Sequence, residues 1–203
     1  MNIAITIARE YGSGGRIIGQ KLAEALGYEF FDKELIELAA KRIGFSEEYV
    51  RENEEKKRFS FISSIYGSSA DLPAADQIFI AQSSVIKEIA QSRNCVIVGR
   101  CADYVLNDYP GALKIFVHAP IEDRARRVFE EYDEDAPNIK NYVQKVDKRR
   151  ASYYNYMTQN KWGQAENYHF AINSSLGIDL TVDMIKAAVK EFKAKIDAEY
   201  PAE

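Results

Sequence analysis

A glycine-rich turn between an apolar strand and a helix, close to the start of the chain, most limits how this sequence can fold. Residues 3–8 are apolar or β-branched throughout, which suits a strand buried on both faces. Gly12, Gly14 and Gly15 follow, and they permit positive φ and a close approach to the backbone. Apolar residues then recur at helical spacing until Gly27. Because such a helix directs its free N–H groups and positive dipole end at one point, we expect an anion to bind there.

The turn departs from the Walker A pattern, in which a glycine is followed after four residues by Gly-Lys-Ser/Thr. Arg9 stands at the first glycine position, Gly15 at the lysine position and Arg16 at the hydroxyl position. The ammonium group for the β- and γ-phosphates and the Mg²⁺-binding hydroxyl are both missing. A phosphate site and a tight structural turn are both compatible with this segment. The guanidinium groups of Arg9 and Arg16 favour phosphate, although two solvated surface charges are the alternative.

Length and charge narrow the class of protein. With 203 residues, of which 46% are hydrophobic, the chain is expected to form one domain with a buried sheet. The formal net charge of −4 argues against nucleic acid as a partner, since nucleic-acid binding depends on a broad positive field. Any phosphate site must therefore be local.

The sequence has no apolar run of transmembrane length, and Met1 leads directly into the first strand. We therefore expect a cytoplasmic protein without a membrane partner. Cys95 and Cys101 lack the spacing of a zinc site. Cys95 is interpreted as core filler at the start of a strand and Cys101 as a small loop residue.

Apolar strands alternate with helical patterns along the chain, which predicts an α/β fold with a parallel sheet covered on both faces. Further strands are expected at 28–31, 94–98, 112–118 and 168–173, and further helices at 33–42, 74–92, 138–156 and 179–195 and after Pro120. Residues 44–75 are first charged and then aromatic and serine-rich, which indicates an inserted helical cap with a mobile segment. Ligands of such folds bind outside the carboxyl ends of the strands. The glycine-rich turn, Asp32, Arg100 and Asn173 all fall at such ends.

Basic residues suited to phosphoryl transfer occur in two further places. This chemistry needs cations around the moving phosphoryl group and a fixed in-line arrangement of two oxygens. Arg100 directly follows a buried strand, and Lys148, Arg149 and Arg150 form a cluster on a predicted helix. Arg100 could instead be an ordinary loop arginine, and the cluster a solvated helix face in which Asp147 pairs with Arg150.

Asp32 is the best candidate for an acid that orders Mg²⁺ through water or positions an acceptor hydroxyl. A second role, compatible with the first, is an N-cap for a helix beginning at Lys33. Asp103 could hydrogen-bond a sugar hydroxyl or cap a turn. Three further residues are assigned to structure and packing: His118, His169 and Trp162.

Several stretches resemble a known family. Residues 3–28, the Val-Ile-Val-Gly-Arg sequence at 96–100, and segments 113–117 and 124–127 resemble bacterial cytidylate kinases. Segments 8–15 and 30–36 match more closely the divergent branch called cytidylate kinase-like proteins. The resemblance implies a three-layer P-loop NTPase fold with a parallel sheet, a helical cap insertion and a helical lid. In one P-loop kinase-like domain spanning 1–203, the core would comprise 1–43, 74–135 and 165–203, the cap about 44–73 and the lid about 136–164.

The resemblance also implies roles for individual residues. Donor phosphates would be held by Gly12, Ser13, Gly14, Gly15 and Arg16, with Mg²⁺ accompanying ATP. Arg100 would contact the acceptor phosphate, and Arg149 and Arg150 would be lid arginines. The family's aspartate after Gly-Arg is Cys101 here, so Asp103 is the candidate for its sugar contact. Arg16 is the candidate for part of the missing lysine's role.

These observations favour ATP-dependent phosphoryl transfer to a small nucleotide, with CMP and dCMP as candidate acceptors. The loss of two Walker A groups leaves open a nucleotide-binding module without catalytic activity. A kinase of a different small metabolite is the third alternative. The sequence identifies neither the acceptor nor the oligomeric state.

Overall fold

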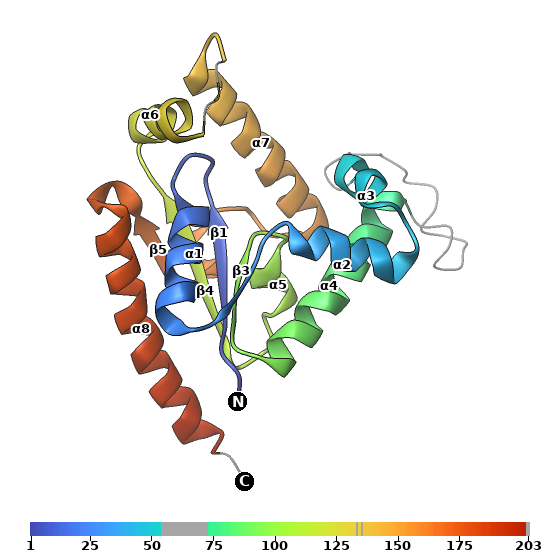
Figure 1. Cartoon of the computed structure of the whole chain (residues 1–203), viewed down its shortest axis with the longest axis vertical. Coiled ribbons are helices and arrows are strands. Elements are labelled where there is room, and N and C mark those ends of the chain that lie inside the picture. The colour runs from blue at the N-terminus through green and yellow to red at the C-terminus, as the bar shows by residue number, and fades with distance from the viewer. Residues whose placement is uncertain (54–72, 133, 135, 202–203) are drawn as a thin grey trace.

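A five-stranded parallel sheet forms the centre of the molecule in the computed structural model, which describes residues 1–53, 73–132, 134 and 136–201 (Figure 1). The strands in chain order are β1 (Ala4–Arg9), β2 (Glu29–Phe31), β3 (Cys95–Val98), β4 (Ala112–His118) and β5 (Phe170–Asn173). They lie in the order β2-β3-β1-β4-β5, and each neighbouring pair is parallel. The prediction of a parallel α/β sheet is confirmed.

Helices follow the strands as the sequence pattern predicts. The longer ones are α1 (Gly15–Leu26), α2 (Glu34–Ile43), α4 (Ala74–Ser92), α6 (Ile121–Glu131), α7 (Ile139–Thr158) and α8 (Ile178–Glu199). Shorter ones are α3 (Glu47–Asn53) and α5 (Ala102–Val105), with 3₁₀ turns η2 (Ala165–Asn167) and η3 (Ser174–Leu176). The predicted bounds differ from these by a few residues at most, as expected where only end positions are uncertain.

The two faces of the sheet bury different helices because side chains alternate along a strand. On one face, Ile5 and Ile7 of β1 pack with residues of α1 and α8. On the opposite face, Ala4 packs with residues of α4 and α5 (Figure 1). A shift of one residue in β1 would turn this apolar set to the other face, so the register of the central strand is strongly specified.

The cap predicted at about 44–73 is described only in part. It contains α3, and Val50 of that helix is fully buried with Ile36 and Ile78 of α2 and α4. The aromatic and serine-rich stretch lies outside the described residues, as does the mobile segment expected there. The division into core, cap and lid stays a prediction.

The strands end at one edge of the sheet, and this edge holds the glycine-rich turn. Asp32 follows β2, the Gly99-Arg100 pair follows β3, and Asn173 ends β5. Among the described helices, none is both long and apolar enough to cross a membrane.

Candidate active site

The glycine-rich turn has the geometry expected of an anion-binding helix start. Gly12 and Gly14 adopt φ values of 79° and 78°, a conformation that favours glycine, and Gly14 is the N-cap of α1. The main-chain N–H groups of Gly14, Gly15 and Arg16 have no hydrogen-bond partner among the described residues. These donors carry the positive end of the helix dipole, so they can receive an anion.

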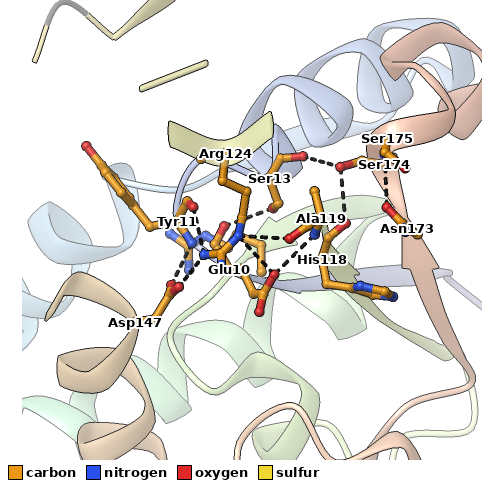
Figure 2. A network of polar contacts seen from close by, with 12 residues as sticks. Glu10, Tyr11, Ser13, His118, Ala119, Arg124, Asp147, Asn173, Ser174 and Ser175 are labelled. Carbon is orange, nitrogen blue, oxygen red and sulfur yellow. Dashed lines mark hydrogen bonds and ion pairs between the residues drawn. The ribbon is translucent and has the colours of Figure 1, made fainter. Parts of the chain in front are cut away.

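Contacts from distant parts of the chain fix the turn. The Ser174 hydroxyl donates to the main-chain oxygen of Ser13 at 2.6 Å and to that of His118 at 3.2 Å (Figure 2). Ser13 is fully buried, and its own hydroxyl donates to the Glu10 main-chain oxygen at 2.8 Å. Arg127 Nη1 donates to the Gly12 oxygen at 2.8 Å. The turn is therefore held from both sides before any ligand arrives.

A buried ion network joins the same turn to the predicted lid (Figure 2). Arg124 of α6 is 7% exposed and its guanidinium bonds the Asp147 carboxylate of α7. Arg124 Nε also lies 3.3 Å from Glu10 Oε2 and donates to the Ala119 oxygen at 2.9 Å. The second carboxylate oxygen of Asp147 accepts the Tyr11 main-chain N–H at 2.7 Å. The basic helix α6 thus contributes a structural cation that the sequence analysis did not single out.

A cavity of about 300 Å³ lies beside the turn at the carboxyl edge of the sheet. Five cationic side chains line it: Arg9, Arg16, Lys33, Arg100 and Arg150. Among the described residues, two carboxylates also line it, Asp32 and Asp103. Positive charge therefore gathers at this cavity in a chain whose net charge is −4. That phosphate binds here stays a prediction.

Asp32 holds two of these arginines. Its carboxylate accepts Arg16 Nε at 2.8 Å, and Arg9 Nη2 lies 3.9 Å from its other oxygen. Arg16 is fixed only through Nε in the described structure, so its terminal nitrogens can bind another anion. The N-cap role suggested for Asp32 is wrong: α2 begins at Glu34, its N-cap residue is Lys33, and no side chain caps it. The Asp32 carboxylate instead pairs with the guanidinium groups of Arg16 and Arg9.

The backbone after β3 is strained where it enters the cavity. Gly99, Arg100 and Cys101 have successive φ values of 79°, 57° and 53°. The left-handed conformation costs a non-glycine residue roughly 1–2 kcal/mol. Such strain is concentrated at functional sites, where it aims a side chain that regular structure would not aim.

A buried carboxyl and a tyrosine, Asp103 and Tyr154, form another part of the cavity wall. Asp103 is 4% exposed and its Oδ2 accepts the Tyr154 hydroxyl at 2.7 Å. Burial raises the pKa of the Asp103 carboxyl above its ordinary value, and the Tyr154 hydrogen bond opposes that shift. Sequence analysis missed Tyr154. The sequence feature that could have identified Tyr154 is its spacing of four residues from Arg150, because this spacing places both residues on one face of α7.

The two predicted lid arginines differ in position. Arg150 lines the cavity, donates from Nη1 to the Arg9 oxygen at 3.2 Å, and lies 5.2 Å above the Tyr11 ring. Arg149 is exposed on α7 and does not line the cavity. The structure therefore brings Arg150 together with Arg16, Asp32, Arg100 and Asp103, but not Arg149.

The remaining candidates make packing contacts. His118 stacks on Phe116, and His169 Nδ1 accepts the Lys114 main-chain N–H at 3.0 Å. Trp162 packs edge-on against Phe116 at 5.4 Å, as expected for packing, and also lines the cavity. Cys95 is fully buried in the core, whereas Cys101 faces the cavity.

The side chains present do not fit a resident Mg²⁺ site. Within the described ranges, no three His, Cys, Asp or Glu side chains are grouped to hold a metal ion. Arg16 occupies the hydroxyl position, and the Asp32 carboxylate faces two guanidinium groups rather than an open coordination site.

Comparison with known proteins agrees with this geometry. The sequence profile of the cytidylate kinase-like family matches residues 4–176. The chain belongs to the cytidylate kinase-like family. No curated protein matches it.

Solved structures show the same fold. An uncharacterized protein from Eubacterium ventriosum has 28% identity and a TM-score of 0.70, with 93% of this chain and 99% of that chain covered. A gluconokinase from Sinorhizobium meliloti has 18% identity and a TM-score of 0.57, covering 98% and 97%. A shikimate kinase from Acinetobacter baumannii, in complex with shikimate, has 16% identity and a TM-score of 0.54, covering 94% and 95%. The predictions of the family and of a P-loop kinase fold are confirmed.

Proposed function

We propose that this protein transfers the γ-phosphoryl group of ATP to a small nucleotide, with CMP and dCMP as the first acceptors to test. The observation that carries the proposal is the cavity in which five cations converge beside a helix N-terminus in an acidic protein. Membership of the cytidylate kinase-like family supports the nucleotide as ligand. Phosphoryl transfer depends on positioning and charge stabilisation, which such a cavity supplies.

Each part of the site has a proposed task. The N–H groups of residues 12–16 and the terminal nitrogens of Arg16 bind the donor phosphates of MgATP. Arg100, aimed by its left-handed backbone, holds the acceptor phosphate. Arg150 approaches from α7 and neutralises charge between the two, and we keep Arg149 as a weaker candidate for the same task. Asp103 hydrogen-bonds a sugar hydroxyl of the acceptor, and Asp32 holds Arg16 in place.

A binding experiment followed by a turnover assay tests the proposal. A ligand that binds only the folded state raises the unfolding temperature by mass action. We expect ATP and a nucleoside monophosphate each to stabilise the protein in a thermal-shift panel that also contains shikimate, gluconate and other hydroxyl acceptors. ADP release coupled to NADH oxidation should then appear only when donor and acceptor are both present. Turnover with a hydroxyl acceptor alone would assign the protein to the metabolite kinases.

A nucleotide-binding module without transferase activity is the second candidate. The observation that favours it is the Walker A sequence itself, in which Gly15 and Arg16 replace the lysine and the hydroxyl. Stabilisation by ATP without ADP release for any acceptor in the panel would establish this alternative and overturn the kinase.

A further inference from the structure

We infer that Arg9 takes the place of the missing Walker A lysine as the phosphate-binding cation. Compared with the motif, the glycine and the cationic residue have changed places: the cation stands at the first-glycine position and glycine stands at the lysine position. This inference deepens the proposed function and rests on it for the donor's identity. Arg9 lies at the last position of β1, where the motif has glycine, and Gly15 lies at the first position of α1, where it has lysine. The two positions meet in the folded chain.

Gly15 lacks a side chain because Arg9 occupies its space. A Cβ built on Gly15 would lie 2.6 Å from the Cβ of Arg9 and 3.0 Å from its Cγ. Unlike Gly12 and Gly14, Gly15 does not have a positive φ, so its backbone conformation does not demand glycine. The close approach of the Arg9 stem is therefore the physical reason for glycine at the lysine position.

The far end of Arg9 reaches the opposite side of the cavity. A Cβ built on Gly99, at the end of β3, would lie 2.1 Å from Arg9 Nη1 and 3.0 Å from Cζ. Nη2 lies 3.9 Å from Asp32 Oδ1. The side chain thus runs from the start of α1 to the end of β3, and its guanidinium lies beside Gly99, the residue before Arg100.

The surrounding structure holds this cation firmly. Arg9 is the last residue of the central strand, its main-chain oxygen accepts a hydrogen bond from Arg150, and its side chain is 21% exposed. In the transfer step an oxygen of the acceptor phosphate forms a bond to the γ-phosphorus. The bond from that phosphorus to the β,γ-bridging oxygen breaks, and its electron pair leaves on ADP. A guanidinium between donor and acceptor stabilises charge on both oxygens during this exchange.

The test removes the cation and then moves it back to the motif's usual position. Arg9→Met keeps the stem over Gly15 and removes the charge, so we expect tripolyphosphate and ATP to bind about ten- to a hundredfold more weakly by isothermal titration calorimetry. Turnover should fall about a hundred- to a thousandfold. Gly15→Lys alone should lower the unfolding temperature because its Cβ meets the Arg9 stem.

The decisive variant is the double substitution Arg9→Gly with Gly15→Lys, which rebuilds the standard motif at both positions. We expect it to bind tripolyphosphate at least tenfold more tightly than Arg9→Gly alone, a coupling that a purely structural role of Arg9 does not produce. Arg126→Met is the matched control, since Arg126 is exposed on α6 and pairs only with Asp123 in the described structure. Its affinity should equal that of the wild type.

The outcomes separate this inference from the proposed function. If Arg9→Met binds tripolyphosphate with wild-type affinity, the inference that Arg9 replaces the lysine is wrong. It is also wrong if the double variant binds tripolyphosphate no more tightly than Arg9→Gly. If the wild type binds ATP yet phosphorylates no acceptor, the kinase proposal fails. The role of Arg9 is still decided in that case, because tripolyphosphate binding requires no transfer. Circular dichroism of each variant establishes that it is folded before its affinity is compared.

Discussion

Asp147 accepts the main-chain N–H of Tyr11 at 2.7 Å and bonds Arg124 with its other oxygen. One carboxylate on α7 therefore holds both the start of the glycine-rich turn and the buried cation of α6. Arg150, one turn later on the same helix, reaches the Arg9 oxygen. Through these contacts the position of α7 and the shape of the glycine-rich turn depend on each other.

Replacing Asp147 by alanine should lower the free energy of unfolding by about 1–3 kcal/mol, because Arg124 and the Tyr11 N–H both lose a buried partner. Glu10 remains near Arg124 and limits the loss. Urea denaturation followed by circular dichroism measures the change. The exposed Lys145→Ala on the same helix is the control and should change stability by less than about 0.5 kcal/mol. Equal effects of the two substitutions would show that the network does not stabilise the fold.

The two lid arginines should differ in their effect on turnover. Arg150→Ala removes a cation that lines the cavity, so we expect kcat to fall about a hundredfold or more. Arg149→Ala removes an exposed side chain and should lower kcat by less than about tenfold. Steady-state ADP release with saturating ATP and acceptor compares them. A larger loss in the Arg149 variant would mean that α7 rotates or shifts when substrate binds.

Arg100→Ala should weaken binding of the acceptor nucleotide far more than binding of the donor ATP. Loss of charge-assisted hydrogen bonds costs about 1.5–3 kcal/mol, which raises the dissociation constant of the nucleoside monophosphate about ten- to a hundredfold. The affinity for ATP should change less than about threefold. Separate calorimetric titrations of CMP and ATP provide the two constants. A parallel loss for both ligands would place Arg100 at the donor phosphates instead.

Asp103 should make stability depend on pH in a direction opposite to that of a salt-bridged carboxylate. Burial raises its folded-state pKa, so the folded state binds the proton more tightly than the unfolded state does. This contribution to stability is full below the ordinary pKa near 3.8 and is lost as pH rises through the raised value. Asp103→Asn keeps an oxygen for the Tyr154 hydroxyl and removes the titration.

Urea denaturation of the two proteins across a pH series measures this effect. We expect the wild type to lose stability relative to Asp103→Asn as pH rises above about 4, with a constant difference once the raised pKa is passed. Other carboxyl groups titrate in both proteins and cancel in the comparison. A difference that does not vary with pH would show that the folded and unfolded pKa values of Asp103 are equal.

The fold was predictable because the strands are short apolar runs and the helices between them have periodic apolar faces. The helix at 74–92 has the predicted bounds, since its stripe of Ile78, Val85, Ile86 and Ile89 is long and regular. Arg100 and Asp32 could be placed at the ligand edge because parallel strands end together. These features depend on local pattern and on one topological rule.

Contacts between distant residues could not be predicted in this way. Pairing of Asp147 with Arg150 was one alternative that the sequence left open, and the structure instead joins Asp147 to Arg124 and to the Tyr11 N–H. Tyr154 meets Asp103 across 51 positions, and only the folded chain brings them together. Likewise, the sequence shows only that Gly15 replaces the Walker A lysine. The structure gives the physical reason, since the Arg9 side chain occupies the space beside Gly15.

The Ser174 hydroxyl that holds the Ser13 oxygen belongs to a residue 161 positions later in the chain. Because synthesis proceeds from the amino terminus, the glycine-rich turn is translated 161 positions before the serine that supports it. A nascent chain that stops before residue 174 would have the glycine-rich turn but not the Ser174 hydrogen bond that supports it. We therefore expect the proposed nucleotide binding to protect ribosome-bound chains of increasing length only after this serine has left the exit tunnel. Ligand binding would then report when the two ends of the fold have met.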